Sequence, residues 1–352
     1  MTRNPRMLDV GEKAFLRKLL PRLSVHSRFV NGFGHDASIV DLGLSDTNLV
    51  MKIDRAAKPI AAINGWCDYR LWGRLAVTAN CSDILTAGGS PKAFMMAISA
   101  PPATPASLVT DIIKGAEEAC QEEDVAFVGG DTKEAGELQV VGTALGVVAK
   151  DRHIDRRLGE PGDRIIVAGC LGGYVGAYWH CANSQTTPSA LSYLSRPRAR
   201  WREAELVSSA ACARSACDMS DGLVDAVMSV VRPGLGVMMQ EAALPFHPLA
   251  RDASERSKTD LLNYAFGVGD WCIAYAVPPE CLAVLDSLRQ NGIELSVVGE
   301  VVEKSGVFIR TADACLEVRS ASANEHFRSR MEDQGDWFRD LMSGDSLRPI
   351  KY

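Results

Sequence analysis

Apolar residues recur along the chain with two different periods, which predict helices and strands. A repeat of three to four residues predicts helices at 9–23, 69–87 and 107–123. Short apolar runs bounded by Gly, Pro or Asp predict strands at 49–53, 92–99, 125–128, 138–148, 164–168, 297–302 and 307–309. Helices and strands are therefore interspersed along most of the chain, which is typical of a mixed α/β (α+β) fold.

The same pattern divides the chain into two halves. Residues 152–162 are charged and run into a Pro-Gly-Asp turn, which predicts a linker. Residues 182–202 are polar and contain two prolines, which favours a surface connection. The hydrophobic signal weakens after Thr311. We expect an N-terminal domain at 1–155, a C-terminal domain at 156–312 and a tail at 313–352.

Composition excludes several classes of protein. The 352 residues are 47% hydrophobic and 23% charged, as in a globular protein. The net charge of −6 argues against nucleic acid as the main partner, because phosphate backbones attract basic surfaces. No apolar stretch is long enough to suggest a membrane partner or a signal peptide. Ten cysteines without a C-x-x-C pair argue against zinc ribbons and indicate a reducing cytoplasm.

Aspartates stand beside Gly, Ser or the end of an apolar run at several points where the predicted secondary structure changes. Carboxylates are the hard oxygen ligands that Mg²⁺ prefers, and small neighbours let a phosphate approach the backbone. A single Asp beside Gly is more often an ordinary turn, so the case depends on the whole set. The set comprises Asp36, Asp54, Asp83, Asp131, Asp218 and Asp221.

The chain has no Walker motif and no kinase-type glycine-rich loop with a following lysine. The glycine-rich stretch at 169–176 follows a predicted strand, and its backbone N–H groups could bind phosphate at a helix start. An ordinary strand–turn–helix connection explains the same glycines.

Six short motifs occur in an order that resembles a known superfamily. They are Gly34-His35-Asp36, Ile53-Asp54, the Asn80–Pro91 segment, Gly129-Gly130-Asp131-Thr132, Pro161-Gly162-Asp163 and the Asp218–Leu223 segment. Together they resemble the superfamily of aminoimidazole ribonucleotide synthetase and thiamine-monophosphate kinase, over residues 30–310. The Asn80, Gly130 and Asp218 segments look most similar to the thiamine-monophosphate kinase branch.

The resemblance implies a fold, a partner and a set of cofactors. It implies a two-domain fold in which N-terminal strands form a barrel shared by a homodimer, followed by an α/β C-terminal domain. The N-terminal domain would bind metal and dimerise, and the C-terminal domain would complete a cleft for ATP and Mg²⁺. The six aspartates would hold metal, with Asp54 and Asp131 also catalytic, while Gly130, Arg156 and Ser220 would contact ATP.

Two departures from the kinase pattern lie among these motifs. His35 stands where the kinases usually have a first Asp, and it could be a general base, because its ordinary pKa is near neutrality. A structural role explains it equally well. Lys52 stands where they have a hydroxyl residue, and it could replace metal charge or contact phosphate. A lysine on the solvent face of a strand is the alternative. We include both residues among the catalytic candidates.

The segment expected to bind the acceptor differs from the kinase pattern. The kinase segment Gly-Glu-Asp-Tyr-Glu, which helps to hold thiamine phosphate, aligns with residues 268–272, where both Glu positions are lost. We therefore expect an acceptor other than thiamine phosphate. Trp66, Asp68, Gly269 and Trp271 are the candidate acceptor residues, although both tryptophans could equally be packing aromatics.

Three hypotheses for function follow. The first is a small-molecule kinase that transfers the γ-phosphoryl group of ATP with Mg²⁺. The second is an ATP-dependent ligase or cyclase that acts through a phosphorylated acyl or amide intermediate. The third is a non-catalytic nucleotide sensor, which ranks last because a sensor has little need for a full set of metal carboxylates.

Overall fold

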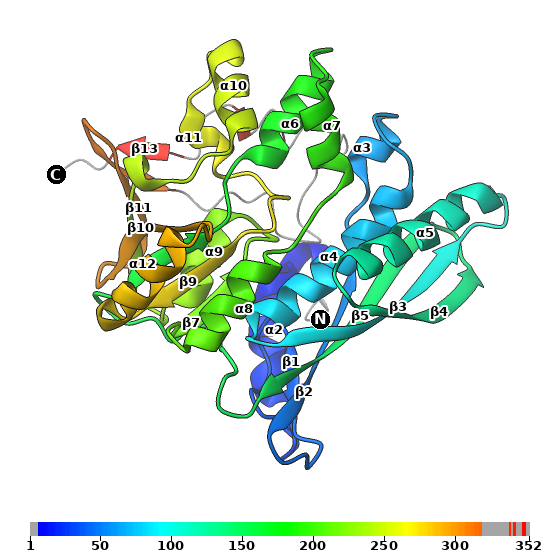
Figure 1. The fold of residues 1–352 in the computed structure, drawn as a ribbon, viewed down its shortest axis with the longest axis horizontal. Helices are drawn as coiled ribbons and strands as arrows, with labels where there is room; N and C mark the ends of the chain where they lie inside the picture. Colours follow the sequence, from blue (N-terminus) through cyan, green and yellow to red (C-terminus); the bar gives the residue numbers. More distant parts are fainter. Residues whose placement is uncertain (1–5, 319–337, 339–340, 343–346, 350–352) are drawn as a thin grey trace, which may run out of the picture.

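The computed structural model describes residues 6–318, 338, 341–342 and 347–349, which form two β-sheets with helices around them (Figure 1). The first sheet has the strand order β1-β2-β5-β3-β4. Its strands are β1 (Ser38–Val40), β2 (Thr47–Arg55), β3 (Ser90–Ala100), β4 (Ala126–Glu134) and β5 (Gln139–Ala149). All neighbours pair antiparallel except β3 and β4, which run parallel.

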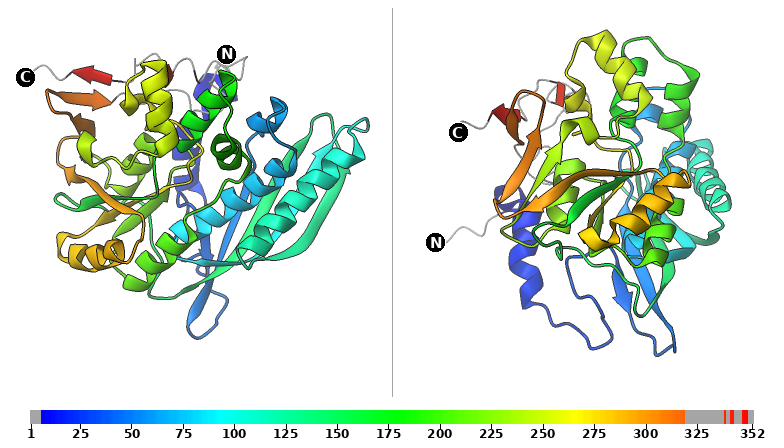
Figure 2. Two further views of the ribbon diagram at one scale, coloured as in Figure 1. Left: turned by 45° about the horizontal axis from the view of Figure 1, so that its top comes forward. Right: turned by 60° about the vertical axis from the view of Figure 1, so that its left-hand side comes forward.

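Two long helices, α4 (Arg70–Thr86) and α5 (Ala106–Glu122), cover one face of this sheet (Figure 2). Alternate residues of β3 and β5 are buried against them, as the period of two in a strand requires. The helices cross closely at Gly73 and Gly115, where a Cβ atom would lie 1.9 Å from a backbone carbonyl oxygen of the other helix. The predicted helices 69–87 and 107–123 are thus confirmed to within one residue at each end.

The second sheet has the order β13-β12-β11-β8-β10-β6-β9-β7. Its strands are β6 (Arg164–Ala168), β7 (Ser215–Asp218), β8 (Gly236–Gln240), β9 (Ile273–Val277), β10 (Leu295–Val302), β11 (Gly306–Arg310), β12 (Cys315–Val318) and β13 (Leu347–Pro349). Strand β9 is buried along its whole length, because both faces of the sheet are covered. Helix α9 (Leu223–Val230) packs on one face, and α8 (Trp201–Ala210) and α12 (Leu282–Gln290) pack on the other.

The remaining helices lie around these layers. Helices α6 (Gly173–Ala182), α7 (Pro188–Ser195), α10 (Pro248–Ser257) and α11 (Leu261–Tyr264) gather at one end, with α3 (Ile60–Ile63) beside α7 (Figure 1). Near the start of the chain lie α1 (Met7–Val10) and α2 (Glu12–Leu19), and short 3₁₀ helices are η1 (Leu20–Arg22), η2 (Glu241–Ala243) and η3 (Pro279–Cys281). No helix in the described part of the chain is long and apolar enough to cross a membrane.

Two segments differ from the sequence expectation. Residues 182–202, expected as a connection, contain α7, which begins with Thr187 as N-cap and Pro188 in its first turn. Two strands of the second sheet, β12 and β13, lie within the expected tail 313–352. Most of that tail lies outside the described residues.

The two halves meet along α4. Its C-terminal part contacts β7 and α8, and Leu85 packs in the hydrophobic cluster beneath the second sheet. This contact places the polar residues near the end of α4 beside the end of β7, where the candidate site is found.

Candidate functional site

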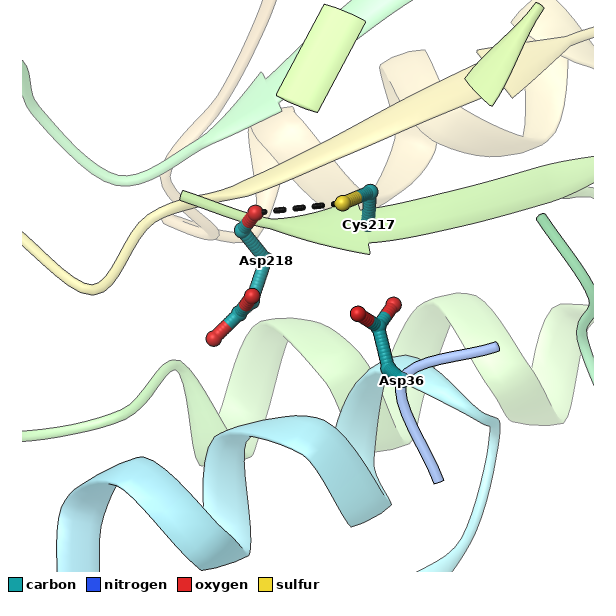
Figure 3. Close-up of side chains that lie close together, drawn as sticks. All are labelled: Asp36, Cys217 and Asp218. Carbon is teal, nitrogen blue, oxygen red and sulfur yellow. Dashed lines mark hydrogen bonds between the residues drawn. The ribbon is translucent and has the colours of Figure 1, made fainter. Parts of the chain in front are cut away.

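Aspartates from both halves of the chain meet where α4 contacts β7. Asp36 precedes β1, and Asp218 is the last residue of β7. Ligand atoms of Asp36, Asp218 and Cys217 all lie within 4.8 Å of one another, and all three residues are buried. Figure 3 shows the carboxylates of Asp36 and Asp218 on the same side of strand β7. These two aspartates are 182 positions apart in sequence, so the fold, and not a local motif, forms the pair.

Asp54 and Asp83 extend this group through Lys52. Val50 lies in the core against α4, and because side chains alternate along a strand, Lys52 and Asp54 lie on the same face of β2. The Nζ atom of Lys52 lies 2.9 Å from Oδ2 of Asp83 and 4.0 Å from Oδ2 of Asp54. The solvent-facing alternative for Lys52 is therefore wrong, since its side chain is only 22% exposed.

Charged residues from both halves of the chain shift one another's pKa values in this group. Burial, followed by the negative charge of Asp218, raises the pKa of Asp83 well above its usual range, although Lys52 opposes the shift. Burial alone would lower the pKa of Lys52, but the facing charges of Asp83, Asp54 and Asp218 outweigh it and raise that pKa. Lys52 therefore stays charged, and the carboxylates repel one another enough to favour a bound cation.

Arg156 and His35 lie at the other side of the group. The Arg156 guanidinium pairs with the carboxylate of Asp36, and its backbone N–H donates to Nδ1 of His35 at 3.2 Å. Burial lowers the pKa of His35, although Asp155 opposes the shift. A neutral His35 that accepts at Nδ1 carries its proton on Nε2. That tautomer does not fit the expected general base, and it fits a residue that positions Arg156.

The turn after β7 carries the next two predicted residues. The hydroxyl of Ser220 donates to Oδ1 of Asp218 at 3.1 Å. Oδ2 of Asp218 is buried and has no hydrogen-bond partner among the described residues. Asp221 follows in the same turn and is exposed. A buried carboxylate oxygen without a donor is costly, so this atom fits a site for a cation.

The donor set fits Mg²⁺ better than a softer metal. Carboxylate oxygens are hard ligands, as Mg²⁺ requires. Burial raises the pKa of Cys217 to about 12, so its sulfur stays a thiol, and it donates to the carbonyl oxygen of Asp218 (Figure 3). Asp36, Asp54, Asp83 and Asp218 would hold the metal, and Cys217 would not.

The structure does not bring Asp131 to this group. Asp131 is paired with Ala97 of β3, which faces away from α4, whereas Lys52 and Asp54 face towards it. Residues paired across strands share a face, so Asp131 lies on the opposite side of the sheet. Gly130 is paired with Met96 and approaches its backbone, where a Cβ atom would lie 1.7 Å from the carbonyl oxygen. The ATP contact predicted for Gly130 and the metal role of Asp131 stay predictions.

The candidate acceptor residues lie around α6. Trp66 packs edge-on against Tyr178, with ring centroids 5.2 Å apart, and a Cβ atom at Gly269 would touch the ring of Tyr174. Trp271 is 9% exposed and Asp68 accepts from the backbone N–H of Arg70. Trp66 and Gly269 thus meet the same helix one turn apart, Trp271 is buried, and Asp68 lies just before α4. The acceptor role of these four residues stays a prediction.

Sequence reasoning missed the role of Asp270. Its carboxylate accepts from the backbone N–H groups of Gly172 and Tyr174, at 2.6 and 2.7 Å, and from the hydroxyl of Tyr193. The N-terminus of α6 is therefore capped by the protein itself, which favours the ordinary strand–turn–helix connection and leaves these two N–H groups unavailable to phosphate. Asp270 lies in the segment 268–272, but its partners are about a hundred residues away in sequence, so no local signal shows the contact.

Comparison with known proteins places these features in a class. The model of the N-terminal domain of AIR synthase related protein matches residues 34–148, and the model of the C-terminal domain matches residues 160–311. The AaThiL structure, complexed with AMPPCP and TMP, superposes with a TM-score of 0.74 at 22% identity, over 88% of this chain and 96% of that chain. The chain therefore has the AIR synthase-related fold, as expected from its motifs.

Relatives in sequence narrow the class to a family. The thiamine-monophosphate kinase of Pyrococcus horikoshii is 30% identical over 245 residues, which are 68% of this chain and 74% of that protein. The thiamine-monophosphate kinase of Rhodopirellula baltica is 26% identical over 318 residues, which are 87% of this chain and 94% of that protein. The chain belongs to the thiamine-monophosphate kinase family. It is accordingly an ATP-dependent kinase of this type, with ATP and Mg²⁺ as cofactors, and the predicted branch is confirmed.

Proposed function

We propose that this kinase transfers the γ-phosphoryl group of ATP to a small acceptor other than thiamine monophosphate. The observation that carries the kinase half is the convergence of Asp36, Asp83 and Asp218, from three distant segments, around one buried carboxylate oxygen that lacks a donor. Mg²⁺ bound at such a site would supply charge neutralisation for the triphosphate.

The chain's own residues would then hold and align the nucleotide. Asp36 and Asp218, with Asp54 and Asp83, bind the metal. Ser220 fixes the rotamer of Asp218 through its hydrogen bond. Arg156 has a planar guanidinium that can bind two phosphate oxygens at once, and His35 holds its backbone in place. Such chemistry depends mainly on positioning and electrostatics.

The acceptor half of the proposal depends on residues 268–272. Gly269 and Cys272 stand where the resembling kinases have carboxylates, and Asp270 is turned inward to cap α6. A cationic acceptor such as thiamine monophosphate would therefore meet no carboxylate from this segment. The relatives are named thiamine-monophosphate kinases, which favours thiamine monophosphate as the acceptor, so it is the first compound to test.

Phosphorus NMR of a turnover mixture tests both halves. We expect no phosphorylated thiamine monophosphate with ATP and Mg²⁺, and ADP plus a new phosphorylated product with the correct acceptor. Conversion of thiamine monophosphate at the rate of an ordinary kinase would overturn the acceptor proposal. Free phosphate with a condensed product would instead identify the ligase. Asp218→Asn serves as the control that should show no turnover. If calorimetry detects no ATP binding to the wild-type protein, the kinase proposal itself is refuted.

We also propose that the chain acts as a homodimer through the first sheet. The face away from α4 and α5 exposes large apolar side chains, including Met51 and Ile53 of β2 and Met95 of β3. Ile53 and Met95 are both paired with Thr143 and therefore share this face. A second copy that covered it would form the barrel that the family resemblance implies. Asp131 lies on this face, so its role has to be tested in the dimer.

Two further proposals concern the cellular compartment and the domain boundary. All ten cysteines are free thiols, which supports a reducing compartment and thus the cytoplasm. The division near residue 155 is supported by the last strand of the first sheet, which ends at Ala149, and by the second sheet, which begins at Arg164.

A further inference from the structure

Two cationic side chains of the protein itself lie on the carboxylates assigned to Mg²⁺. The Lys52 ammonium contacts Asp83 at 2.9 Å and lies 4.0 Å from Asp54. The Arg156 guanidinium contacts Asp36. The four carboxylates of Asp36, Asp54, Asp83 and Asp218 thus face two built-in positive charges.

Lys52 and Arg156 are held in different ways. Lys52 is in the middle of β2, which is paired with β5 along its whole length, and its side chain lies between the sheet and α4. Arg156 is in the connection between β5 and β6, outside both sheets. Pairing with Ala144 of β5 fixes the backbone of Lys52, whereas a connection outside the sheets is freer to move. Lys52 therefore stays on Asp83 whether or not metal is present.

We propose that the Lys52 ammonium permanently replaces one divalent cation of the phosphotransfer site, so that this chain binds one metal ion fewer than it would with a hydroxyl residue at position 52. The inference rests on the proposed function, because the metal ions concerned are those that neutralise ATP. Asp36 and Asp218, whose Oδ2 atom lacks a donor, are left to hold metal.

The chemistry of a lysine suits this replacement. An ammonium group is a compact charge with three donors, so it can interact with Asp83 and Asp54 at once. Mg²⁺ demands oxygen ligands at about 2.0–2.1 Å in octahedral geometry and loses its water reluctantly. A lysine at 2.9 Å from Asp83 occupies the space in which such an ion would sit. With a single charge it compensates only part of the negative charge, so metal at Asp36 and Asp218 is still required.

The test counts metal ions directly. Mn²⁺ is titrated into the metal-free protein, with and without AMPPCP, and free Mn²⁺ is measured by electron paramagnetic resonance. We expect Lys52→Ser to bind one Mn²⁺ more per chain than the wild type. Lys52→Arg, which keeps the charge, should give the wild-type count. Lys58→Ser is the matched control, since Lys58 is an exposed lysine that pairs with Glu137 away from the site.

Melting temperatures give a second readout that does not depend on nucleotide or turnover. Without metal, Lys52→Ser and Lys52→Met should melt below the wild type, because Asp54, Asp83 and Asp218 repel one another unopposed. Mn²⁺ should restore Lys52→Ser more than it stabilises the wild type. Equal Mn²⁺ counts in wild type and Lys52→Ser, or an extra ion in Lys52→Arg, would overturn the proposal. Failure of the wild type to bind AMPPCP would refute the proposed function, while the titration with Mn²⁺ alone would still decide the role of Lys52.

Discussion

Asp83 is a buried carboxylate that faces another carboxylate, Asp218, across the contact between the two domains. Burial, followed by the charge of Asp218, raises its pKa, so folding disfavours the charged form of this carboxyl. We expect Asp83→Asn to keep or raise the melting temperature of the metal-free protein, because folding disfavours the charge of Asp83 and Lys52 still faces Asp54 and Asp218. The same change should weaken Mg²⁺-dependent binding of AMPPCP at least about tenfold, since the Lys52 ammonium is then no longer held on Asp83 and competes with Mg²⁺ for the remaining carboxylates. Calorimetry and thermal melts measure the two effects.

Asp41→Asn is the control for this prediction. Asp41 is an exposed turn residue that accepts from the backbone N–H of Gly43, far from the metal group. It should leave the Mg²⁺-dependent affinity unchanged. If Asp83→Asn and Asp41→Asn bound AMPPCP equally well, Asp83 would have no part in organising the metal site.

Individual site residues differ in how far the sequence could predict them. Asp36, Asp83 and Asp218 stand in short motifs with Gly or Ser, and the structure brings these three together. The contact of Lys52 with Asp83 could not be foreseen, because it requires knowledge of which face of β2 meets α4. Asp131 has an equally good motif, yet a single register on β3 decides which face it occupies.

At the scale of elements, the start of α6 depends on one side chain from a distant strand connection. Asp270 is buried and accepts hydrogen bonds from Gly172, Tyr174 and Tyr193. Asp270→Ala leaves these donors without a partner in the protein interior. We expect it to lower the free energy of unfolding by about 2–4 kcal/mol, measured by urea denaturation monitored by circular dichroism.

Asp286→Ala provides the comparison for that measurement. Asp286 pairs with Arg289 on the exposed surface of α12, where an ion pair contributes little. Its unfolding curve should overlay that of the wild type. An Asp270→Ala protein as stable as Asp286→Ala would mean that water replaces the carboxylate at the N-terminus of α6.

Elements with strong local signals could be predicted from the sequence, and those that depend on distant partners could not. Helices α4 and α5 have a full apolar period, and the structure places both within a residue of their predicted limits. Helix α7 lies in a segment whose two prolines favour a connection, although Thr187-Pro188 is itself a typical helix start. Strands β12 and β13 have only four and three residues and form by pairing with a sheet already present.

At the scale of the whole molecule, the described elements leave a large apolar face of the first sheet uncovered. Helices cover one face of the first sheet, and the other face exposes Ile53, Met95 and Val128 at 67%, 37% and 55%. Exposed apolar patches of this kind usually mark an interface. In a two-fold symmetric dimer each substitution occurs twice, so a charge placed at the centre repels its own copy. We expect wild-type protein to sediment as a dimer and Ile53→Glu to sediment as a 38.0 kDa monomer.

The control for this last prediction is Val284→Glu, which adds the same charge at an exposed apolar residue of α12, outside the first sheet. It should leave the dimer intact in sedimentation at the same protein concentration. The double variant Ile53→Glu/Met95→Glu guards against an interface that tolerates one charge, since the two residues flank Thr143 on neighbouring strands. A wild-type monomer, or a double variant that still dimerises, would place the interface elsewhere. Asp131 lies on the same face as Ile53 and Met95. Either result would therefore also argue against a role for Asp131 at a dimer interface.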